Sequence, residues 1–278
     1  MKTAVIGHVE WCDFVRVARV PQPGEIVETT EDFSEPAGGG AVAAVQLARL
    51  AGDCTFFTAL GDDEIGDHVA AGLSELGVTV EAVRRRGKRT RRGFVYLDDQ
   101  GERTITTVGE RLRPERADDL PWEKLADTGG VYFVAGDADA LRAARSAGAV
   151  VATARIMDLL VSAGVALEAV VGSGRDGAER YRPVEPPPRY VVVTAGSRGG
   201  SWSGAEGREG TWAAAPLPGP VADAYGCGDS FAAGFTFGLG EGLDVEAALE
   251  IAARCGAACM TGRGPYARQL SAADLEDH

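Results

Sequence analysis

The chain has 278 residues, 45% of them apolar and 25% charged, which is enough for one large α/β domain or two average ones. Its formal net charge of −13 argues against a nucleic-acid partner, because nucleic-acid binders normally carry a basic face. No apolar run reaches the length of a membrane span or leader, and the five cysteines form no CxxC pair, so we expect a cytoplasmic protein with reduced thiols and no membrane partner.

Short apolar strands alternate with amphipathic helices along most of the chain. Strands are expected at residues 3–7, 54–59, 131–134, 149–152, 169–171 and 190–194, and helices at 41–50, 65–76, 138–147, 228–241 and 245–259. Continuous apolar strands of this kind are usually buried on both faces. The alternation therefore predicts an α/β fold with a mostly parallel sheet that helices cover on both sides.

Two stretches break this alternation. Residues 11–27 have nearly alternating apolar side chains, and residues 92–97 and 103–108 flank a turn sequence, Asp-Asp-Gln-Gly, that predicts a β-hairpin. Together they predict a small antiparallel sheet, formed by about residues 9–33 and 84–108. We expect this sheet to act as a lid on a single domain that spans residues 1–278, because open α/β sheets bind ligands at the ends of their strands.

One loop has the features of an anion site. Gly226, Cys227 and Gly228 leave backbone N–H groups uncovered, and a helix expected to follow adds partial positive charge at its N-terminus. Asp229 would lie beside that site, where a carboxylate can accept a proton from a hydroxyl that attacks a phosphoryl group. The local sequence alone leaves open whether Asp229 is such a base or only an acidic residue that begins a helix.

The segment Asp223-Ala-Tyr-Gly-Cys-Gly-Asp-Ser-Phe resembles the C-terminal signature of the ribokinase-like (PfkB) carbohydrate kinases, D-[TS]-x-G-A-G-D-x-F. Further matches to that family follow in order at residues 21–25, 47–50, 57–66, 101–104 and 191–199. The resemblance implies a ribokinase-like three-layer sandwich with a small β-sheet lid. It also implies transfer of the ATP γ-phosphoryl group to a hydroxyl of a sugar or nucleoside, with Asp229 as base and the amides of Gly226, Cys227 and Gly228 as the anion hole.

The same resemblance implies positions for the cofactors. ATP is expected along Thr194, Gly196, Gly199 and Gly228. Asp176 falls where the family has the last residue of N-x-x-E, which organises Mg²⁺ through water; a simple polar turn is the alternative. Asp223 would supply an oxygen to a monovalent cation, unless the nearby Arg268 side chain replaces that ion.

The positions at which the resemblance implies substrate binding are the ones that match the family least. Gly38 and Gly39 are retained, but Val42 stands where an Asn that contacts the substrate is common. Arg155 is also retained, and it is expected to face the phosphates or the substrate. Changed polar groups in a binding pocket mean a changed ligand, so these losses predict an atypical acceptor.

The first strand of the predicted lid carries a second departure. Cys12 stands where relatives carry the Asp that binds sugar hydroxyls, and Asp13 is adjacent to it. Residues 10 and 12 share one face of a strand, whereas residue 13 points to the other face. Glu10 could therefore replace the missing carboxylate, or it could be an exposed charge of the lid.

Other functions explain the sequence less well. Residues 38–43 satisfy G-x-G-x-x-A, but residues 33–37 before them make a poor strand, which argues against a Rossmann dehydrogenase. A kinase-like sensor of nucleotide or sugar would explain the altered substrate positions, although it would have no need of Asp229. The arginine-rich segment 84–92 favours a solvated loop, and exposed lid edges predict a homodimer.

Overall fold

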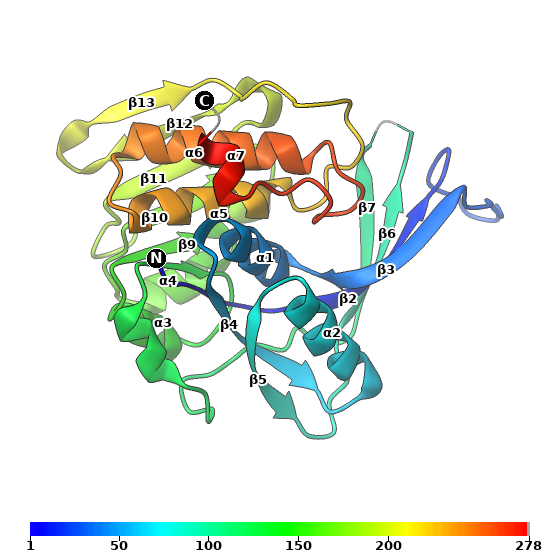
Figure 1. The fold of residues 1–278 in the computed structure, drawn as a ribbon, viewed down its shortest axis with the longest axis horizontal. Helices are drawn as coiled ribbons and strands as arrows, with labels where there is room; N and C mark the ends of the chain where they lie inside the picture. The colour runs from blue at the N-terminus through cyan, green and yellow to red at the C-terminus, as the bar shows by residue number, and fades with distance from the viewer. Residues whose placement is uncertain (100, 277–278) are drawn as a thin grey trace.

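The computed structural model describes residues 1–99 and 101–276; Gln100, in the predicted hairpin turn, lies outside them. Nine strands form one sheet in the order β13-β12-β11-β10-β9-β8-β1-β4-β5 (Figure 1). All neighbours from β11 to β5 pair in parallel, and β12 and β13 are antiparallel at one edge. The strands are β1 (Thr3–Ile6), β4 (Cys54–Gly61), β5 (Thr79–Arg85), β8 (Gly130–Phe133), β9 (Ala149–Thr153), β10 (Ala169–Ser173), β11 (Tyr190–Thr194), β12 (Gly200–Gly204) and β13 (Glu209–Trp212).

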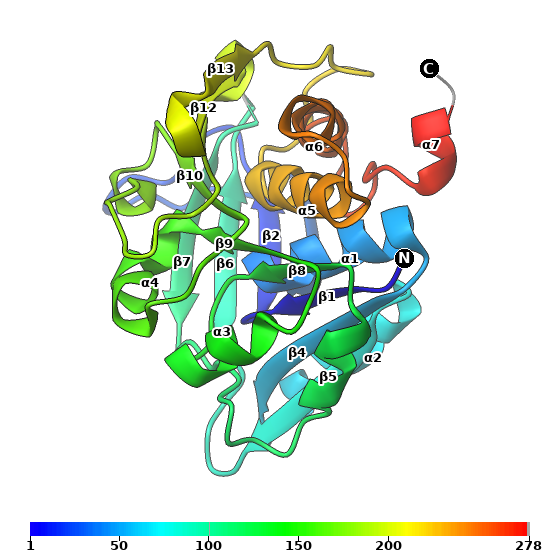
Figure 2. The same cartoon turned by 90° about the vertical axis from the view of Figure 1, so that its left-hand side faces the viewer.

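Helices cover both faces of this sheet (Figure 2). One layer contains α1 (Gly39–Ala51), α2 (Glu64–Glu75), α5 (Cys227–Gly240) and α6 (Val245–Cys259), with the short α7 (Ala272–Glu276) beside α1. The other contains the 3₁₀ turn η1 (Trp122–Asp127), α3 (Ala138–Ala144) and α4 (Met157–Ala163). Further 3₁₀ turns are η2 (Ala154–Ile156), η3 (Gly177–Glu179), η4 (Gly196–Arg198) and η5 (Ala205–Gly207). Within the described chain, no helix is long and apolar enough to cross a membrane.

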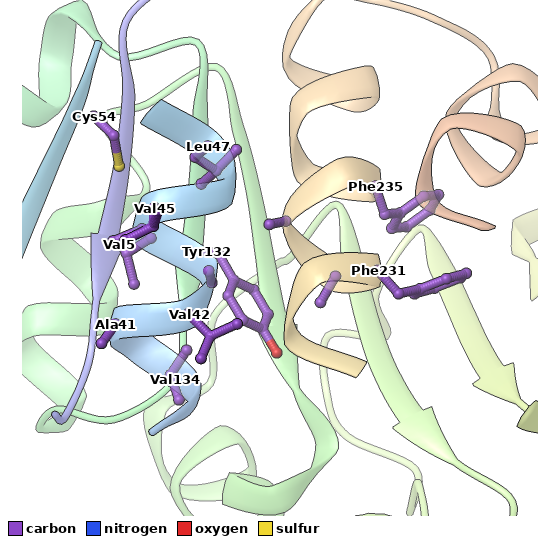
Figure 3. Close-up of a cluster of buried hydrophobic side chains, with 14 of the residues drawn as sticks. Val5, Ala41, Val42, Val45, Leu47, Cys54, Tyr132, Val134, Phe231 and Phe235 are labelled. Atoms are coloured by element: carbon purple, nitrogen blue, oxygen red, sulfur yellow. The ribbon is translucent and has the colours of Figure 1, made fainter. Parts of the chain in front are cut away.

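Successive residues of β1 point into two different hydrophobic cores, one on each face of the large sheet. Val5 packs beside α1, in the same core cluster as Phe235, which projects from the other side of α5 in Figure 3. Ala4 and Ile6 pack into the opposite core with Leu141 of α3. Because side chains of a strand alternate between faces, an all-apolar strand needs a covering layer on each side. The predicted three-layer sandwich is thereby confirmed.

A second sheet of four strands projects from one side of the large sheet (Figure 1), with the order β3-β2-β6-β7. Its strands are β2 (Glu10–Arg16), β3 (Glu31–Ala37), β6 (Arg92–Leu97) and β7 (Arg103–Val108). The hairpin β6–β7 lies at the predicted residues. The prediction of a fully antiparallel sheet was wrong, because β2 and β6 pair in parallel. These two strands follow β1 and β5, which run in the same direction in the large sheet, so they enter the small sheet in the same direction.

The bounds of the small sheet also differ from the expectation. It continues to Ala37, and residues 84–85 belong to β5 at the edge of the large sheet. Residues 33–37, expected to make a poor strand, form most of β3 and lead directly into α1. Pro36 is tolerated there because β3 is an edge strand, with a neighbour on one side only.

Candidate active site

At the start of α5, no side chain caps the backbone N–H groups of the first turn. Its N-cap is Gly226 at φ 78°, where a side chain would also come within 2.9 Å of Val42 Cγ1. The first helical bond at this end runs from the N–H of Ser230 to the Gly226 carbonyl, at 2.8 Å. The amides of Cys227 and Gly228 therefore precede the helical ladder, and helix ends of this kind bind anions.

The Asp229 carboxylate lies in the first turn of α5 and faces the start of α1. Its Oδ1 is 2.6 Å from the place that a Cβ would take on Gly39, the first residue of α1. Val134 Cγ1, just beyond β8, is 3.5 Å from the same point. Two helix starts and the end of a central strand thus converge on one partly buried carboxylate, and the missing side chain at residue 39 makes room for it.

The environment of Asp229 raises its pKa to about 6. Burial is the largest cause and the negative charge of Glu179 adds to it, whereas the guanidinium groups of Arg103 and Arg155 oppose the rise. The carboxylate is therefore ionised at neutral pH but is a much better proton acceptor than an ordinary Asp. A pKa near the working pH is what a general base needs.

With Asp229 as the base that the family resemblance implies, we expect the rate of phosphotransfer to depend on this ionisation. Since a base must be deprotonated, kcat/KM should be constant above about pH 7 and fall about tenfold per pH unit well below pH 6. An Asp with its ordinary pKa of 3.8 would keep full activity to about pH 5. The measurement is kcat/KM from about pH 4.5 to 8.5, with unfolding followed in the same buffers. A flat profile down to pH 5 would contradict the raised pKa.

Side chains of β2 alternate between the site and the opposite face of the small sheet. Glu10 and Cys12 point inward, as predicted. Asp13 lies on the opposite face, where it accepts hydrogen bonds from Ser34 Oγ at 2.6 Å and from Arg92 Nη2 at 2.7 Å. The prediction of Asp13 as a substrate-binding residue thus finds no support in its position.

Glu10 is a buried carboxylate at the edge of the site, with 5% of its surface exposed, and not an exposed lid charge. Its Oε1 is 3.2 Å from Arg91 Nε and 3.9 Å from His8 Nε2. Burial raises the pKa of Glu10, and the positive charges of Arg91 and Arg111 lower it. Burial and the same arginines lower the pKa of His8 to about 3, so that this imidazole is neutral.

Cys12 and Val42 belong to the core rather than to an open surface. Both side chains are fully buried, and Val42 lies between α1 and α5 beside Tyr132 (Figure 3). Cys12 Sγ is 3.8 Å from the hydroxyl of Tyr225, which accepts a hydrogen bond from the N–H of Gly38 at 2.9 Å. Burial raises the pKa of Cys12 to about 12, so its thiol cannot substitute for a carboxylate.

Arg155 follows β9 and joins two carboxylates of the segment after β10. Its Nη2 is 2.7 Å from Asp176 Oδ2 and also pairs with Glu179. Asp176 accepts a further hydrogen bond from the N–H of Ala178, and these two bonds lower its pKa. Glu179 was not predicted, although it follows Asp176 at the spacing of the N-x-x-E motif. Carboxylate oxygens fit hydrated Mg²⁺, but the described residues contain no cluster of three such ligands.

The predicted nucleotide turn lies beside these carboxylates. In the parallel pair β10–β11, Ser173 is opposite Thr194, and the N–H of Gly174 donates to the Thr194 carbonyl at 2.8 Å. Gly196 and Gly199 have φ values of 64° and 78°, which favour glycine. A side chain at residue 199 would also come within 1.9 Å of a backbone carbonyl oxygen. Both the positive φ and the lack of space therefore require glycine at this position.

The small sheet closes over the loop before α5. Arg103 Nη1 donates to the Ala224 carbonyl at 2.9 Å, and the Ala224 N–H donates to the Gly101 carbonyl at 3.2 Å. Arg16 Nη2 donates to the Ala222 carbonyl at 3.0 Å. Arg103 also lowers the pKa of Asp229 and so belongs to the site. Its place in the G-E-R match was the available signal, but the sequence did not show which way it points.

Asp223 is fully buried, and one of its oxygens has no hydrogen-bond partner among the described residues. Its Oδ1 accepts from the Tyr225 N–H at 2.7 Å, whereas Oδ2 is unpaired, as is Oε1 of the neighbouring Glu35. Burial raises the pKa of Glu35 to about 7. Unpaired carboxylate oxygens fit a cation. The suggestion that Arg268 replaces that ion finds no support in its position, because Arg268 is exposed and the guanidinium charges that act on Asp223 are those of Arg16 and Arg103 in the small sheet.

Known proteins resemble this chain over nearly its whole length. The sequence matches the family described as "pfkB family carbohydrate kinase" over residues 2–162 and 167–272. It is 28% identical to the ATP-dependent ribose-1-phosphate kinase of Halopiger xanaduensis, over 96% of this chain and 94% of that protein. Among solved structures, the ribokinase of Arabidopsis thaliana complexed with ribose and ATP has a TM-score of 0.79 at 21% identity, covering 99% of this chain and 97% of that one. The Thermotoga maritima ribokinase has a TM-score of 0.78 at 19% identity, covering 99% and 98%.

The match covers both the sheet ends that carry Arg155 and Asp176 and the loop that carries Asp229. The structural neighbours share the large sheet together with the small one, since they align over almost the entire chain. On the match to the family over nearly the whole sequence, this chain belongs to the pfkB family of carbohydrate kinases.

Proposed function

We propose that this kinase transfers the γ-phosphoryl group of ATP to a hydroxyl of a sugar or nucleoside-like small molecule, with Asp229 as general base. The observation that carries the proposal is the Asp229 carboxylate, with a pKa of about 6, in the same helical turn as uncapped amides. The hydroxyl would give its proton to Asp229 as its oxygen attacks the phosphorus. The amides of Gly226, Cys227 and Gly228 would stabilise the charge on the phosphoryl oxygens.

ATP would lie across the ends of β10 and β11, along Thr194, Gly196 and Gly199. A cavity of about 840 Å³ between residues 212–218 and one side of α6 is suited to the adenine. Asp176 and Glu179 would hold hydrated Mg²⁺, which supplies positive charge to the triphosphate. A monovalent cation would lie against Asp223 Oδ2, the carboxylate oxygen that has no hydrogen-bond partner among the described residues.

The acceptor would lie between Asp229 and the inner face of the small sheet. Glu10 is the buried carboxylate on that face, and its charge acts on Asp229. Gly38 and Gly39 at the start of α1 lie between these two carboxylates, since side chains there would meet Glu10 and Asp229 respectively, and Arg155 would border the same space. The small sheet would exclude water as a lid, and so limit the loss of ATP to hydrolysis.

The experiment that tests this function is ADP release from ATP and Mg²⁺ with a panel of sugars, nucleosides and their phosphates. We expect at least one acceptor to raise ADP release well above the rate without acceptor. The panel is run in potassium and in tetramethylammonium buffer, and a requirement for potassium would support the cation beside Asp223. If ATP binds but no acceptor raises ADP release, the alternative of a nucleotide-binding sensor is favoured.

We also propose that two copies associate through the outer face of the small sheet. That face exposes Phe94, and Val108 lies at the end of its edge strand, with 37% and 53% of their surfaces exposed. Exposed edge strands and apolar sheet faces are pairing surfaces. The mass in solution by sedimentation measures this directly.

A further inference from the structure

Arg155 lies between the two carboxylates that would hold hydrated Mg²⁺. Its Nη2 donates to Asp176 Oδ2 at 2.7 Å and also bonds to Glu179 Oε1, so one nitrogen serves both acids. All three side chains are partly open to solvent, with 40%, 44% and 24% of the surfaces of Arg155, Asp176 and Glu179 exposed. A hydrated cation can therefore approach the same oxygens that the guanidinium group occupies.

The backbone beneath the two carboxylates is fixed without help from Arg155. Asp176 begins the turn η3, and its Oδ1 accepts a hydrogen bond from the N–H of Ala178 at 2.9 Å. The Glu179 N–H donates to the Asp176 carbonyl at 3.0 Å. The Glu179 carbonyl oxygen packs against β10, where it lies 2.4 Å from the place that a Cβ would take on Gly172. The segment that carries both acids would therefore keep its shape if the guanidinium group left them.

The backbone of Arg155 is also fixed, whereas its side chain can turn. Arg155 lies in η2, directly after β9, and its N–H donates to Thr153 Oγ1 at 3.2 Å. The turn η2 packs against β10 and η3. An arginine side chain has several rotatable bonds, and an ion pair that is open to solvent holds it only weakly. Releasing the two acids thus requires a rotation of one side chain and no movement of the backbone.

A metal ion and the guanidinium group would compete for these oxygens. Mg²⁺ keeps several of its waters and is bound at nucleotide sites through one or two carboxylates together with the phosphates, which fits the two acids present here. An arginine stays charged at every physiological pH, so Arg155 cannot yield the site by losing a proton. Two positive groups on the same pair of acids would repel each other. The metal ion can therefore bind both acids only if Arg155 moves away.

We propose that Arg155 takes the place of the metal ion in the nucleotide-free protein, and that it leaves Asp176 and Glu179 when Mg²⁺ binds. This exchange rests on the proposed function, which assigns the metal ion to these two acids. The charges of Glu179 and Arg155 shift the pKa of Asp229 in opposite directions, so the exchange takes place within electrostatic reach of the proposed base. Once released, the guanidinium group is available to the anionic groups that the substrates bring.

The first test measures metal binding without turnover. Mn²⁺, whose EPR signal is sharp only when the ion is free, is titrated into the wild type and Arg155→Gln in the absence of nucleotide. We expect Arg155→Gln to bind Mn²⁺ about tenfold more tightly, because two half-exposed ion pairs no longer compete with the metal. The double variant Asp176→Asn with Glu179→Gln should lose this binding.

Arg182→Gln is the matched control for Arg155→Gln. It removes the same charge from the segment after η3, where Arg182 pairs with the exposed Asp158 and not with the two acids. Its Kd for Mn²⁺ should stay within about twofold of the wild-type value at about 0.15 M salt, because exposed charges are screened. An Arg155→Gln protein that binds Mn²⁺ no more tightly than Arg182→Gln would overturn the exchange.

The second test uses the wild type alone and so does not depend on whether Arg155→Gln folds. Crystals are grown with Mn²⁺ and a non-hydrolysable ATP analogue, and anomalous scattering locates the metal. We expect Mn²⁺ beside Asp176 and Glu179, with Arg155 Nη2 beyond hydrogen-bond distance of both acids. A metal ion at this position with both bonds of Arg155 intact would show that no exchange occurs.

Two further outcomes separate the exchange from the function on which it rests. Mn²⁺ bound elsewhere, in a protein that releases ADP with an acceptor, would overturn the exchange and leave the phosphotransfer intact. Tighter Mn²⁺ binding by Arg155→Gln, in a protein that no acceptor stimulates to release ADP, would support the exchange and count against the phosphotransfer.

Discussion

Replacing Asp229 by Asn should lower kcat about 10²- to 10⁴-fold, the range that a positioned general base contributes. The amide keeps the size of the side chain and its place at the start of α5, but it cannot accept the hydroxyl proton. KM for ATP should change little, because the amides of Gly226 and Gly228 are backbone groups that the substitution leaves in place. The measurement is steady-state ADP release with the best acceptor from the panel.

The Asp229→Asn variant should also be at least as stable as the wild type. Burial raises the pKa of Asp229 from 3.8 to about 6, so keeping it ionised above pH 6 costs folding free energy that a neutral amide does not. Asp13→Asn is the matched control, since Asp13 lies on the opposite face of the small sheet. A near-normal kcat for Asp229→Asn, with a strong loss for Asp13→Asn, would overturn the assignment of the base.

Replacing Gly39 by Ala should lower kcat about a hundredfold without unfolding the protein. The added methyl would lie 2.6 Å from Asp229 Oδ1, which is closer than a real contact allows, so the carboxylate has to move. A displacement of about 1 Å of a catalytic group can cost about a hundredfold in rate. The measurements are kcat and the free energy of unfolding. We expect the free energy of unfolding to change by about 1 kcal/mol or less, because alanine is a better helix former than glycine and the atom that must move is at the end of the Asp229 side chain.

Gly219→Ala is the control for this substitution. A Cβ at residue 219 would meet Thr261 at 3.7 Å, an ordinary contact, so activity and stability should both stay close to the wild type. If Gly39→Ala keeps full activity, the carboxylate tolerates displacement and its present position is not the reactive one. If Gly39→Ala unfolds while Gly219→Ala folds, the expectation that the Asp229 side chain can yield to the methyl group is wrong.

Elements with a strong local pattern could be predicted, and so could the edge strand β7 through its hairpin turn, whereas the other strands at or beside the sheet edges could not. The strand Tyr190–Thr194, both strands of the hairpin and the helix Val245–Cys259 lie at their predicted residues. By contrast, β3, β5, β12 and β13 were missed or assigned to loops. They lie at or beside the edges of their sheets, where one side faces solvent, so their sequences are polar and lack a continuous apolar run. Their existence follows from neighbours that are distant in the sequence.

The candidate site shows the same division. The loop of Gly226 to Asp229 has a sequence signature, because bare amides require glycine and small residues. Arg111 has none, and the motif matches at Arg103 and Glu179 do not show where these side chains point, since their roles depend on which segments the fold brings together. The alternation along β2 correctly separated Glu10 from Asp13. The charge-rich segment before β6 was expected to be solvated; Lys88 pairs with the exposed Glu110, but Arg85 pairs with the nearly buried Asp118, and Arg91 turns inward to Glu10.

The hydroxyl of Tyr225 makes two contacts of unequal strength. It accepts a 2.9 Å hydrogen bond from the N–H of Gly38, whereas its approach to the Cys12 thiol is a loose 3.8 Å. In the lid motion that we propose for the small sheet, the contact with the sulfur should separate first, and the tyrosine should stay bonded to the start of α1. The loop that we propose for phosphate binding would then keep its shape when the small sheet moves away from it.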